Sequence, residues 1–265
     1  MAVEIDFSGK VVAVTGGGRG VGAGIVARFL EAGAEVEICG RSGARGDQGG
    51  RSAPEELPVV DGRKPVFSQV DVRDPEQVAA WIAAITSRLG RLDVVVNNAG
   101  GAPYADFATA SPRFHEKISA LNFLATAYVS QAAYEALKAS RGSIINISSI
   151  SARRPSPGTA VYGAAKAAVE SLTGSIAVEW APDVRVNAIS CGLVATPGSE
   201  DHYGSAEQRA AVAATIPRGV FATPEEVGDA CLMLASPLAA HITGAVLAVD
   251  GGGEWPAFLQ HTPNS

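Results

Sequence analysis

Residues 11–22, VVAVTGGGRGVG, decide the fold of this chain. The first five residues are an unbroken apolar run, which is typical of a parallel strand buried on both faces. Glycines then allow the backbone to turn tightly, and Val21, Ile25 and Phe29 recur at the four-residue spacing of a helix. In this context the glycine run is more than a turn. It predicts a nucleotide-binding loop, because a pyrophosphate can approach the glycine backbone and bind at the positive helix N-terminus.

Apolar runs and helical patterns alternate along the rest of the chain. Strands are expected at residues 11–15, 35–39, 66–72, 94–97, 143–148, 185–189 and 245–249. Helices are expected at residues 21–32, 75–89, 112–140, 161–180 and 224–235. This pattern predicts a single α/β domain over residues 1–265, a Rossmann-type doubly wound parallel sheet of about seven strands with helices on both faces. Residues 41–65, rich in Gly, Arg and Pro, are expected to form a long surface loop with a short turn near 55–57.

Composition limits the classes of function. The 265 residues are 47% hydrophobic and 18% charged, so we expect a packed core. A net charge of −6 gives no basic surface for nucleic acid, and no apolar run is long enough to cross a membrane. The first ten residues lack the apolar segment of a signal peptide, and the cysteines are scattered and odd in number. We therefore expect a soluble cytoplasmic protein with no metal site, no nucleic-acid partner and no membrane partner.

Tyr162 and Lys166 lie four residues apart in an expected helix, which places both side chains on one face. A nearby positive charge favours the phenolate, so the pair can supply an acid or a base near neutral pH. Lowering the pKa of a phenol from about 10 toward 7 takes roughly 4 kcal/mol. One charge at about 4 Å supplies about that much at an effective dielectric constant near 20. The spacing alone is a weak signal, and its weight depends on the other motifs.

Five motifs in a fixed order resemble the short-chain dehydrogenase/reductase family in its classical form. They are residues 15–22, residues 97–100, the group Ser149, Tyr162 and Lys166, residues 185–187, and residues 249–252. The resemblance extends from about Phe7 to Gly252. It implies an oxidoreductase that transfers a hydride between a nicotinamide cofactor and a small-molecule ketone or secondary alcohol.

The resemblance also implies roles for individual residues. Tyr162 would be the acid/base, and Lys166 would lower its pKa and hold the nicotinamide ribose. Ser149, thirteen residues before Tyr162, would hydrogen-bond the substrate oxygen, in preference to Ser148. Asn122, an amide inside a long helix, would sit at a helix irregularity that holds a water for proton relay. The alternative is a buried amide that bonds only to backbone.

Cofactor-binding residues follow from the same resemblance. They are Gly16, Gly18, Arg19, Gly20, Val21, Gly22, Arg41, Asp71, Val72, Asn98, Ala99, Gly100, Tyr162, Lys166, Gly192, Val194 and Thr196. Asp71 and Val72, expected to close the third strand, would hold the adenine. Residues 98–100 would pass beneath the adenosine and ribose, and Thr196 would contact the carboxamide or the phosphates.

The end of the second strand bears on cofactor choice. NAD-selective relatives usually place an acid where Gly40 stands, to bind the ribose 2′-hydroxyl. Here Arg41 follows, and Arg19 lies in the glycine turn, so two guanidiniums could bind a 2′-phosphate. We expect NADP(H). The alternatives are an NAD-dependent catabolic dehydrogenase, in which Arg41 is only solvated, and a nucleotide-binding regulator without turnover.

The substrate side is defined by fewer signals. Residues 197–221 are expected to form a helical lid that includes an exposed His202, and residues 102–104 and 150–157 should form other walls, suited to a fairly apolar substrate. Cys191 stands where the family usually has proline, and we expect a space-filling residue rather than a reactive thiol. Small residues on the helices of Asn122 and Tyr162, with the resemblance, imply a homotetramer of 222 symmetry.

Overall fold

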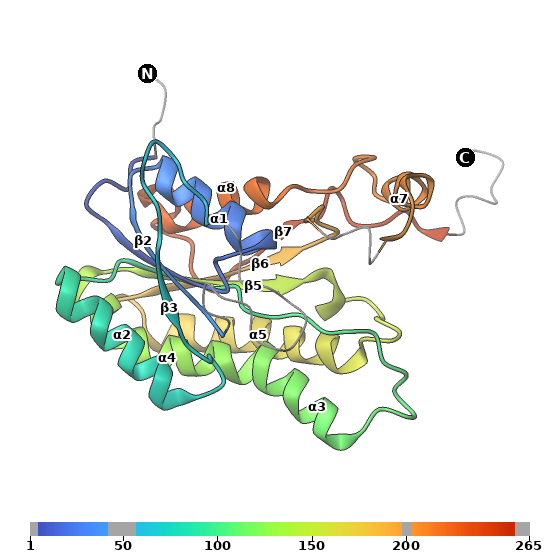
Figure 1. The fold of residues 1–265 in the computed structure, drawn as a ribbon, viewed down its shortest axis with the longest axis horizontal. Helices are drawn as coiled ribbons and strands as arrows, with labels where there is room; N and C mark the ends of the chain where they lie inside the picture. The colour runs from blue at the N-terminus through green and yellow to red at the C-terminus, as the bar shows by residue number, and fades with distance from the viewer. Residues whose placement is uncertain (1–4, 42–56, 198–202, 258–265) are drawn as a thin grey trace.

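The computed structural model describes residues 5–41, 57–197 and 203–257, which form a parallel sheet with helices on both faces (Figure 1). The seven strands follow the order β3-β2-β1-β4-β5-β6-β7, and every pair is parallel. Their bounds are β1 Val11–Thr15, β2 Glu35–Gly40, β3 Val66–Gln69, β4 Val94–Asn97, β5 Ser143–Ser149, β6 Arg185–Cys191 and β7 Val246–Val249. The predicted fold class is confirmed.

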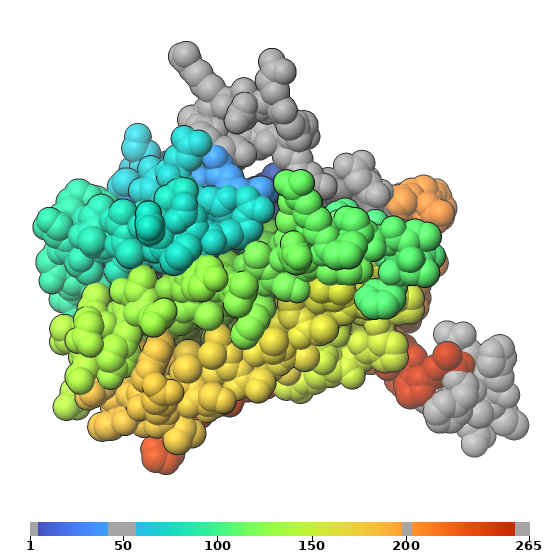
Figure 2. All heavy atoms as spheres, turned by 90° about the horizontal axis from the view of Figure 1, so that it is seen from below, coloured from blue at the N-terminus to red at the C-terminus, as the bar shows by residue number. Residues whose placement is uncertain are grey.

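Helices cover the two faces of the sheet in separate groups (Figure 1). One face carries α1 (Gly20–Glu31) and α8 (Pro224–Ala235), and the other carries α2 (Pro75–Leu89), α4 (Ala125–Ser140) and α5 (Ala160–Glu179). Figure 2 looks onto the second group, with α2, α4 and α5 running across it. The chain reverses direction across the sheet between β1 and β4, so a crevice for a ligand is expected at the carboxyl ends of these strands.

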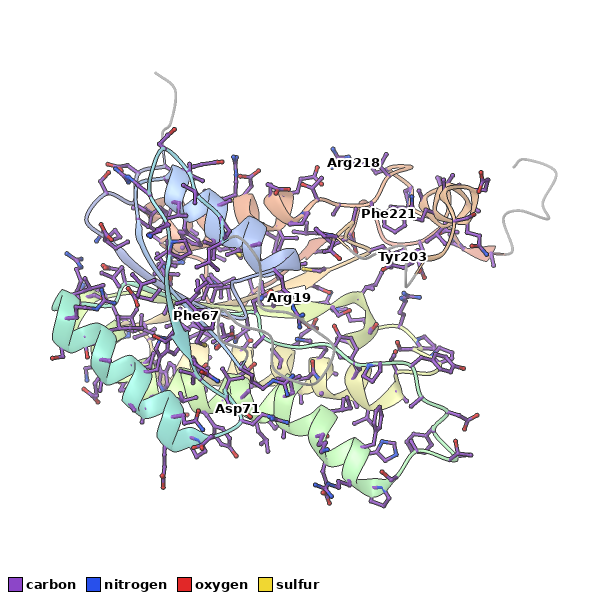
Figure 3. All side chains as sticks on the ribbon, viewed as in Figure 1. Arg19, Phe67, Asp71, Tyr203, Arg218 and Phe221 are labelled. Carbon is purple, nitrogen blue, oxygen red and sulfur yellow. The ribbon has the colours of Figure 1, made fainter. Side chains whose placement is uncertain are left out.

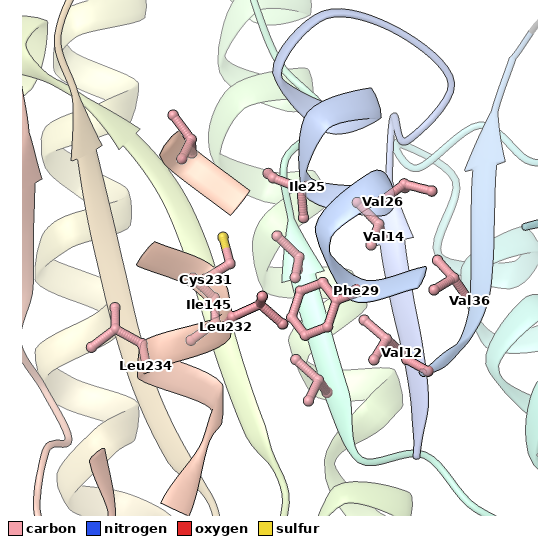
Figure 4. Packing of buried hydrophobic residues seen from close by; sticks show 14 of the residues in the cluster. Val12, Val14, Ile25, Val26, Phe29, Val36, Ile145, Cys231, Leu232 and Leu234 are labelled. Atoms are coloured by element: carbon pink, nitrogen blue, oxygen red, sulfur yellow. The ribbon is translucent and has the colours of Figure 1, made fainter. Parts of the chain in front are cut away.

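A hydrophobic cluster on each face holds these layers together. On the α1 side, Phe29 is fully buried among Val12, Val14 and Leu232 (Figure 4). Its ring meets Phe7 edge to face at 5.1 Å. On the other side a second cluster joins α2, α4 and α5 to the sheet. Burial of an aromatic ring of this size contributes about 2 to 3 kcal/mol, so the helix after the glycine turn is held firmly against β1.

The third strand differs from its prediction. It ends at Gln69 instead of residue 72, and Val66 is 44% exposed. The reason is its position at the edge of the sheet, where it has one neighbouring strand, β2. Asp71 and Val72 therefore lie in the turn after the strand, where the Asp74 N–H donates to the Asp71 carbonyl.

The expected long helix over residues 112–140 is divided into three parts. Ser111 caps α3 (Pro112–Ser119) by accepting from the N–H of Phe114. A π-helical turn follows at Ala120–Leu124 and contains Asn122, and α4 continues from Ala125. The predicted irregularity at Asn122 is thus present, as is typical of π turns near functional sites.

The described part of the lid contains α7 (Ala206–Ala213), which begins with a reciprocal capping pair between Ser205 and Gln208. His202 and the rest of residues 198–202 lie outside the described residues, as do residues 42–56 of the expected long loop. The described end of that loop contains a short bridge between Val60 and Arg63. None of the helices in the described ranges is both long enough and apolar enough to span a bilayer.

Candidate active site

The glycine turn after β1 is shaped for an anionic ligand. Gly16 has φ +65°, and a Cβ on Gly22 would lie 2.3 Å from the Gly16 carbonyl oxygen, so no side chain fits there. The N-cap residue of α1, Arg19, makes no side-chain capping bond, and the first turn contains no acid. The N–H groups of this turn can therefore bind a phosphate, as the pyrophosphate of a dinucleotide requires.

Asn98 ties the end of β4 to the glycine turn. Its Nδ2 donates to the carbonyls of Thr15 at 3.0 Å and Gly16 at 3.2 Å. In return, Thr15 Oγ1 accepts the backbone N–H groups of Asn98 and Ala99, each at 3.0 Å. The amide of Asn98 is therefore committed to holding the turn. This leaves the backbone of Ala99 and Gly100 as the part of the segment next to the crevice.

Several charged side chains lie around the place where the adenosine of the cofactor is predicted to bind. Arg19 and Arg41 are both exposed (Arg19 is labelled in Figure 3). Asp71 accepts from Arg73 Nε at 2.8 Å, and this bond, assisted by the charge of Arg41, holds the pKa of Asp71 below its ordinary value. At Gly40 a Cβ would make only ordinary contact, 3.5 Å, with the ring of Phe67. Position 40 therefore has room for a side chain.

Ser149 and Tyr162 meet at the carboxyl end of β5. The two side chains are hydrogen-bonded, and Ser149 Oγ also accepts the N–H of Ser151 at 3.2 Å. Ser148 instead faces α5, where its hydroxyl donates to Glu170 Oε1 at 2.9 Å. The hydrogen bonds therefore make Ser149, and not Ser148, the serine beside the phenol.

Lys166 lies beneath this pair and is only 3% exposed. Its Nζ donates to the Ile147 carbonyl at 2.7 Å and lies 5.7 Å from the centre of the Tyr162 ring. Burial lowers the pKa of Lys166 to about 8, because a low-dielectric environment disfavours the ammonium.

The expectation that the pKa of Tyr162 is lowered is wrong for this structure. Burial raises the pKa of Tyr162, and the hydrogen bond from Ser149 offsets only part of this effect. The ammonium of Lys166 is directed at the Ile147 carbonyl rather than at the phenol oxygen, so desolvation of the phenolate dominates.

Asn122 lies at the centre of the π turn and is fully buried. Its Nδ2 donates to the carbonyls of Gly101 at 3.0 Å and Ile118 at 2.9 Å, and its Oδ1 accepts the Gly101 N–H at 2.7 Å. These contacts match the alternative of an amide bonded to backbone. A Cβ on Gly100 would lie 2.8 Å from Asn122 Oδ1 and 3.2 Å from Lys166 Nζ. Because glycine has no side chain, Asn122 and Lys166 can both lie against the backbone after β4.

Cys191 ends β6 directly opposite Ser149 in the sheet register. Burial raises the pKa of its thiol to about 12, with the charge of Lys166 acting weakly in the opposite direction. A thiol of this kind keeps its proton, and the thiolate is the reactive form, which supports a space-filling role. The adjacent Gly192 is required by packing, since a Cβ there would lie 2.7 Å from Asp250 Cα.

The segment after β6 links the lid to the glycine turn. The Thr196 methyl carbon would lie 3.6 Å from a Cβ on Gly20, so Thr196 lies against the glycine turn that would hold the phosphates. Val194 forms an isolated bridge with Ala222, which joins the two ends of the lid. A hollow of about 530 Å³ lies between Thr196, α7 and Phe221.

Two residues of this region had no signal in the sequence. His115 lies between the rings of Phe107 at 5.2 Å and Phe114 at 5.8 Å, and lines a small cavity together with Tyr162. Its Nδ1 is buried without a hydrogen-bond partner in the described part of the chain. Glu254, in the segment after β7, forms an ion pair with Arg154. Neither residue belongs to a recognisable motif. Within the described ranges no three His, Cys, Asp or Glu side chains are placed to hold a metal ion.

A doubly wound sheet with a glycine turn at its switch point binds dinucleotides, and the half-buried tyrosine and buried lysine beside it indicate a nicotinamide-dependent oxidoreductase. Comparison with known proteins agrees with this class. A family model described as enoyl-(acyl carrier protein) reductase matches residues 16–254. The chain belongs to the short-chain dehydrogenase/reductase family.

Known proteins resemble this chain along nearly its whole length and nearly the whole of their own. The chain is 39% identical to L-fucose dehydrogenase of Bos taurus over 261 residues, which cover 96% of this chain and 93% of the relative. It is 36% identical to the 3-oxoacyl-[acyl-carrier-protein] reductase FabG of Chlamydia muridarum over 248 residues, 92% of this chain and 96% of the relative. The ligand-free aldohexose dehydrogenase of Thermoplasma acidophilum superposes with a TM-score of 0.84 at 32% identity, with 94% and 96% of the two chains covered. The protein is therefore an NAD(P)-dependent oxidoreductase.

Proposed function

We propose that this protein is an NADP(H)-dependent oxidoreductase that interconverts a secondary alcohol and a ketone, with Tyr162 as the acid/base. The observation that carries the proposal is the hydrogen-bonded pair Ser149 and Tyr162 above the buried ammonium of Lys166. A nicotinamide bound in the crevice would accept or supply the hydride. It would be held by the glycine turn, by residues 98–100, by Lys166 and by Thr196.

The protonation states of the site support proton donation by Tyr162. Because its pKa is raised, the phenol keeps its proton at neutral pH and can give it to a carbonyl oxygen as that oxygen gains negative charge. The Ser149 hydroxyl is oriented by the Ser151 N–H and hydrogen-bonds the Tyr162 side chain. A substrate oxygen beside both groups would receive two hydrogen bonds, which strengthen as charge develops.

We assign Asn122 to the proton path of Lys166. The π turn takes backbone groups out of the regular helical ladder beside Lys166, and such groups can hold a water. Lys166 donates one hydrogen bond in the described part of the chain, to Ile147, and has further N–H donors for that water. The amide of Asn122 fixes the chain at Gly101, which keeps this water site next to the ammonium.

Cofactor preference is proposed from the charges at the end of β2. Arg19 and Arg41 are exposed, and position 40 carries no acid that would repel a 2′-phosphate. Titration of intrinsic fluorescence with NADPH and NADH tests this, and a tenfold or greater preference of the wild type for NADH contradicts it. Gly40→Asp is the matched variant, because the Cβ fits against Phe67. We expect it to weaken NADPH binding at least tenfold and to leave NADH binding intact or improved.

The acid/base assignment is tested by Tyr162→Phe. Turnover is followed at the nicotinamide absorbance with a panel of ketones and secondary alcohols and with either cofactor. We expect a loss of kcat of at least a hundredfold, while cofactor binding by fluorescence changes less than threefold. Wild-type turnover retained in Tyr162→Phe contradicts the mechanism, and an absence of turnover with every substrate would support a nucleotide-binding regulator.

We further infer that residues 1–265 act as one cofactor-binding and catalytic unit with a lid at residues 197–221, and that the unit is a homotetramer. Val178 on α5 is 81% exposed and Leu124 at the start of α4 is 37% exposed, so an apolar surface is open for a second copy. A monomer in light scattering contradicts the tetramer. The free, buried cysteines suit a reducing compartment, and we place the protein in the cytoplasm.

A further inference from the structure

Three separate segments on the substrate side meet at Arg154. Arg154 follows Ser149 by five residues, and Glu254 follows β7. Tyr203 lies in the lid, three residues before α7 begins. Arg154 Nη1 and Glu254 Oε1 are 3.0 Å apart. Burial raises the pKa of Tyr203, and the charge of Arg154 offsets part of this rise, so the phenol is near the guanidinium. Tyr203 also acts electrostatically on Tyr162, so this group of side chains lies near the proposed acid/base.

The Arg154 guanidinium offers further hydrogen-bond donors. It has five N–H groups, and Nη1 pairs with Glu254. Its Nε is buried without a partner among the described residues, so the exposed end of the guanidinium is the part that a ligand oxygen can reach. The side chains of Arg154 and Glu254 are 36% and 35% exposed, so the pair is open on one side to a ligand.

The tail that carries Glu254 does not depend on this ion pair for its position. The Trp255 N–H donates to the Thr215 carbonyl at 3.0 Å, and the Arg218 N–H donates to the Gly251 carbonyl at 3.0 Å. These backbone bonds already fasten the tail to the end of the lid. The ion pair between Arg154 and Glu254 is therefore not needed to hold this segment against the lid, and it can serve to bind a ligand.

We propose that Arg154 and Glu254 are specificity-determining residues that recognise the hydroxyl groups of a neutral, polyhydroxylated substrate, such as an aldose or a cyclic polyol. The inference rests on the proposed function, in which Tyr162 and Ser149 act on one hydroxyl-bearing carbon of that substrate. A guanidinium donor beside a carboxylate acceptor matches neighbouring hydroxyls, each of which donates and accepts. The two charges compensate one another, so the pair favours a neutral ligand over an anionic one.

This inference replaces the expectation of a fairly apolar substrate. The lid does present an apolar surface, since Phe221 lines the hollow beside α7 and packs against Tyr203 at 5.0 Å (Figure 3). Arg154 and Glu254, however, add two charged groups beside Tyr203. An apolar ring placed against them would desolvate the pair without replacing its contacts to water, so it would bind poorly.

The test compares substrates that differ only in ring hydroxyls. Aldohexopyranoses are paired with 2-hydroxytetrahydropyran, which has the same hemiacetal carbon, and inositol is paired with cyclohexanol. We expect the wild type to prefer the polyhydroxylated member by at least tenfold in kcat/KM. Arg154→Met should lower kcat/KM for that member by about ten- to a hundredfold and change it less than threefold for the other. Glu254→Gln should act in the same direction with a smaller effect.

The neighbouring residue offers a matched control. Arg153 pairs with Glu170 at 3.0 Å and is 56% exposed, so Arg153→Met removes the same kind of interaction one position away. We expect it to leave kcat/KM for both members of each pair within threefold of the wild type.

Each result has a defined meaning. An equal loss for both members in Arg154→Met shows that the pair only positions the loop and overturns the recognition, as does a wild type with no preference. If no alcohol or ketone is turned over with either cofactor, the proposed function fails, and calorimetry with the sugars alone decides the recognition. Sugar binding to the wild type that is lost in Arg154→Met and kept in Arg153→Met supports it, and no binding to the wild type overturns it.

Discussion

Replacing Lys166 with methionine should change how the stability of the protein depends on pH. In the folded protein the pKa of Lys166 is lowered to about 8 by burial, compared with an ordinary value of 10.5. Below pH 8 the ammonium is present in both the folded and the unfolded chain, so the full cost of burying it is included in the free energy of unfolding. Between pH 8 and 10.5 the unfolded chain holds a proton that the folded protein has released, and stability from this group therefore rises with pH.

The magnitude follows from the shift. A change from 10.5 to about 8 corresponds to about 3 kcal/mol when each pH unit contributes 1.36 kcal/mol. Integrated from pH 7 to pH 9.5, the wild type should gain about 2 kcal/mol relative to Lys166→Met. Tyr162 and Cys191, the titratable groups next to Lys166, have raised pKa values and keep their protons in the folded protein over this range, while more distant groups titrate alike in both proteins and cancel in the difference. The lost hydrogen bond to Ile147 lowers the stability of the variant by a similar amount at each pH, so it does not affect the slope.

Urea denaturation without cofactor measures this difference. Both proteins are unfolded at pH 7.0, 8.0, 9.0 and 9.5 at one protein concentration, and tryptophan fluorescence reports the transition. Lys138→Met is the matched control, because Lys138 is exposed on α4 beside Asp183, and its difference from the wild type should not grow over this range. A difference for Lys166→Met that stays constant within about 0.5 kcal/mol between pH 7 and 9.5 would refute the argument that burial destabilises this ammonium.

Two further predictions concern the glycine turn and the cysteines. Gly22→Ala should raise the Kd for NADPH at least tenfold in a fluorescence titration, because the added Cβ would meet the Gly16 carbonyl oxygen. Gly174→Ala on α5 is the control and should leave that Kd within twofold, since no atom lies within 4 Å of the added Cβ. Equal effects of the two variants would show that the turn does not hold the cofactor. Iodoacetamide at pH 7.5 should label less than one thiol per folded chain, because all three cysteines are buried, and it should label all three after urea is added. Rapid labelling of Cys191 in the folded protein would show that its thiol is reactive.

The fold could be predicted from the sequence wherever burial is decided by local pattern. Apolar runs such as residues 11–15 are buried on both faces in the middle of a parallel sheet, and the structure has them as strands. The same reasoning failed at residues 70–72, where Val70 and Val72 are buried against α2 and its neighbours although the strand has already ended at Gln69. The position of a strand in the sheet depends on long-range pairing, which a short run of residues does not encode.

The candidate site shows the same division between local and long-range information. The structure brings the side chains of Ser149 and Tyr162 together, as the resemblance implies through their thirteen-residue offset. The direction of the pKa shift of Tyr162 was wrong, since it depends on how deeply the fold buries the phenol. The contact between Arg154 and Glu254 joins residues 100 positions apart and had no sequence signal.

The shifted pKa values of Tyr162 and Lys166 have one cause and are linked. Burial favours the neutral form of each group, so the phenol gains proton affinity and the ammonium loses it. Loss of a proton by Tyr162 would create an anion near Lys166, which would in turn stabilise the ammonium. The two groups should therefore titrate as a coupled pair, with apparent pKa values that belong to the pair. It follows that the pH dependence of kcat in Tyr162→Phe or Lys166→Met cannot be obtained by removing one ionisation from the wild-type profile, because each variant also changes the charge that the remaining group experiences.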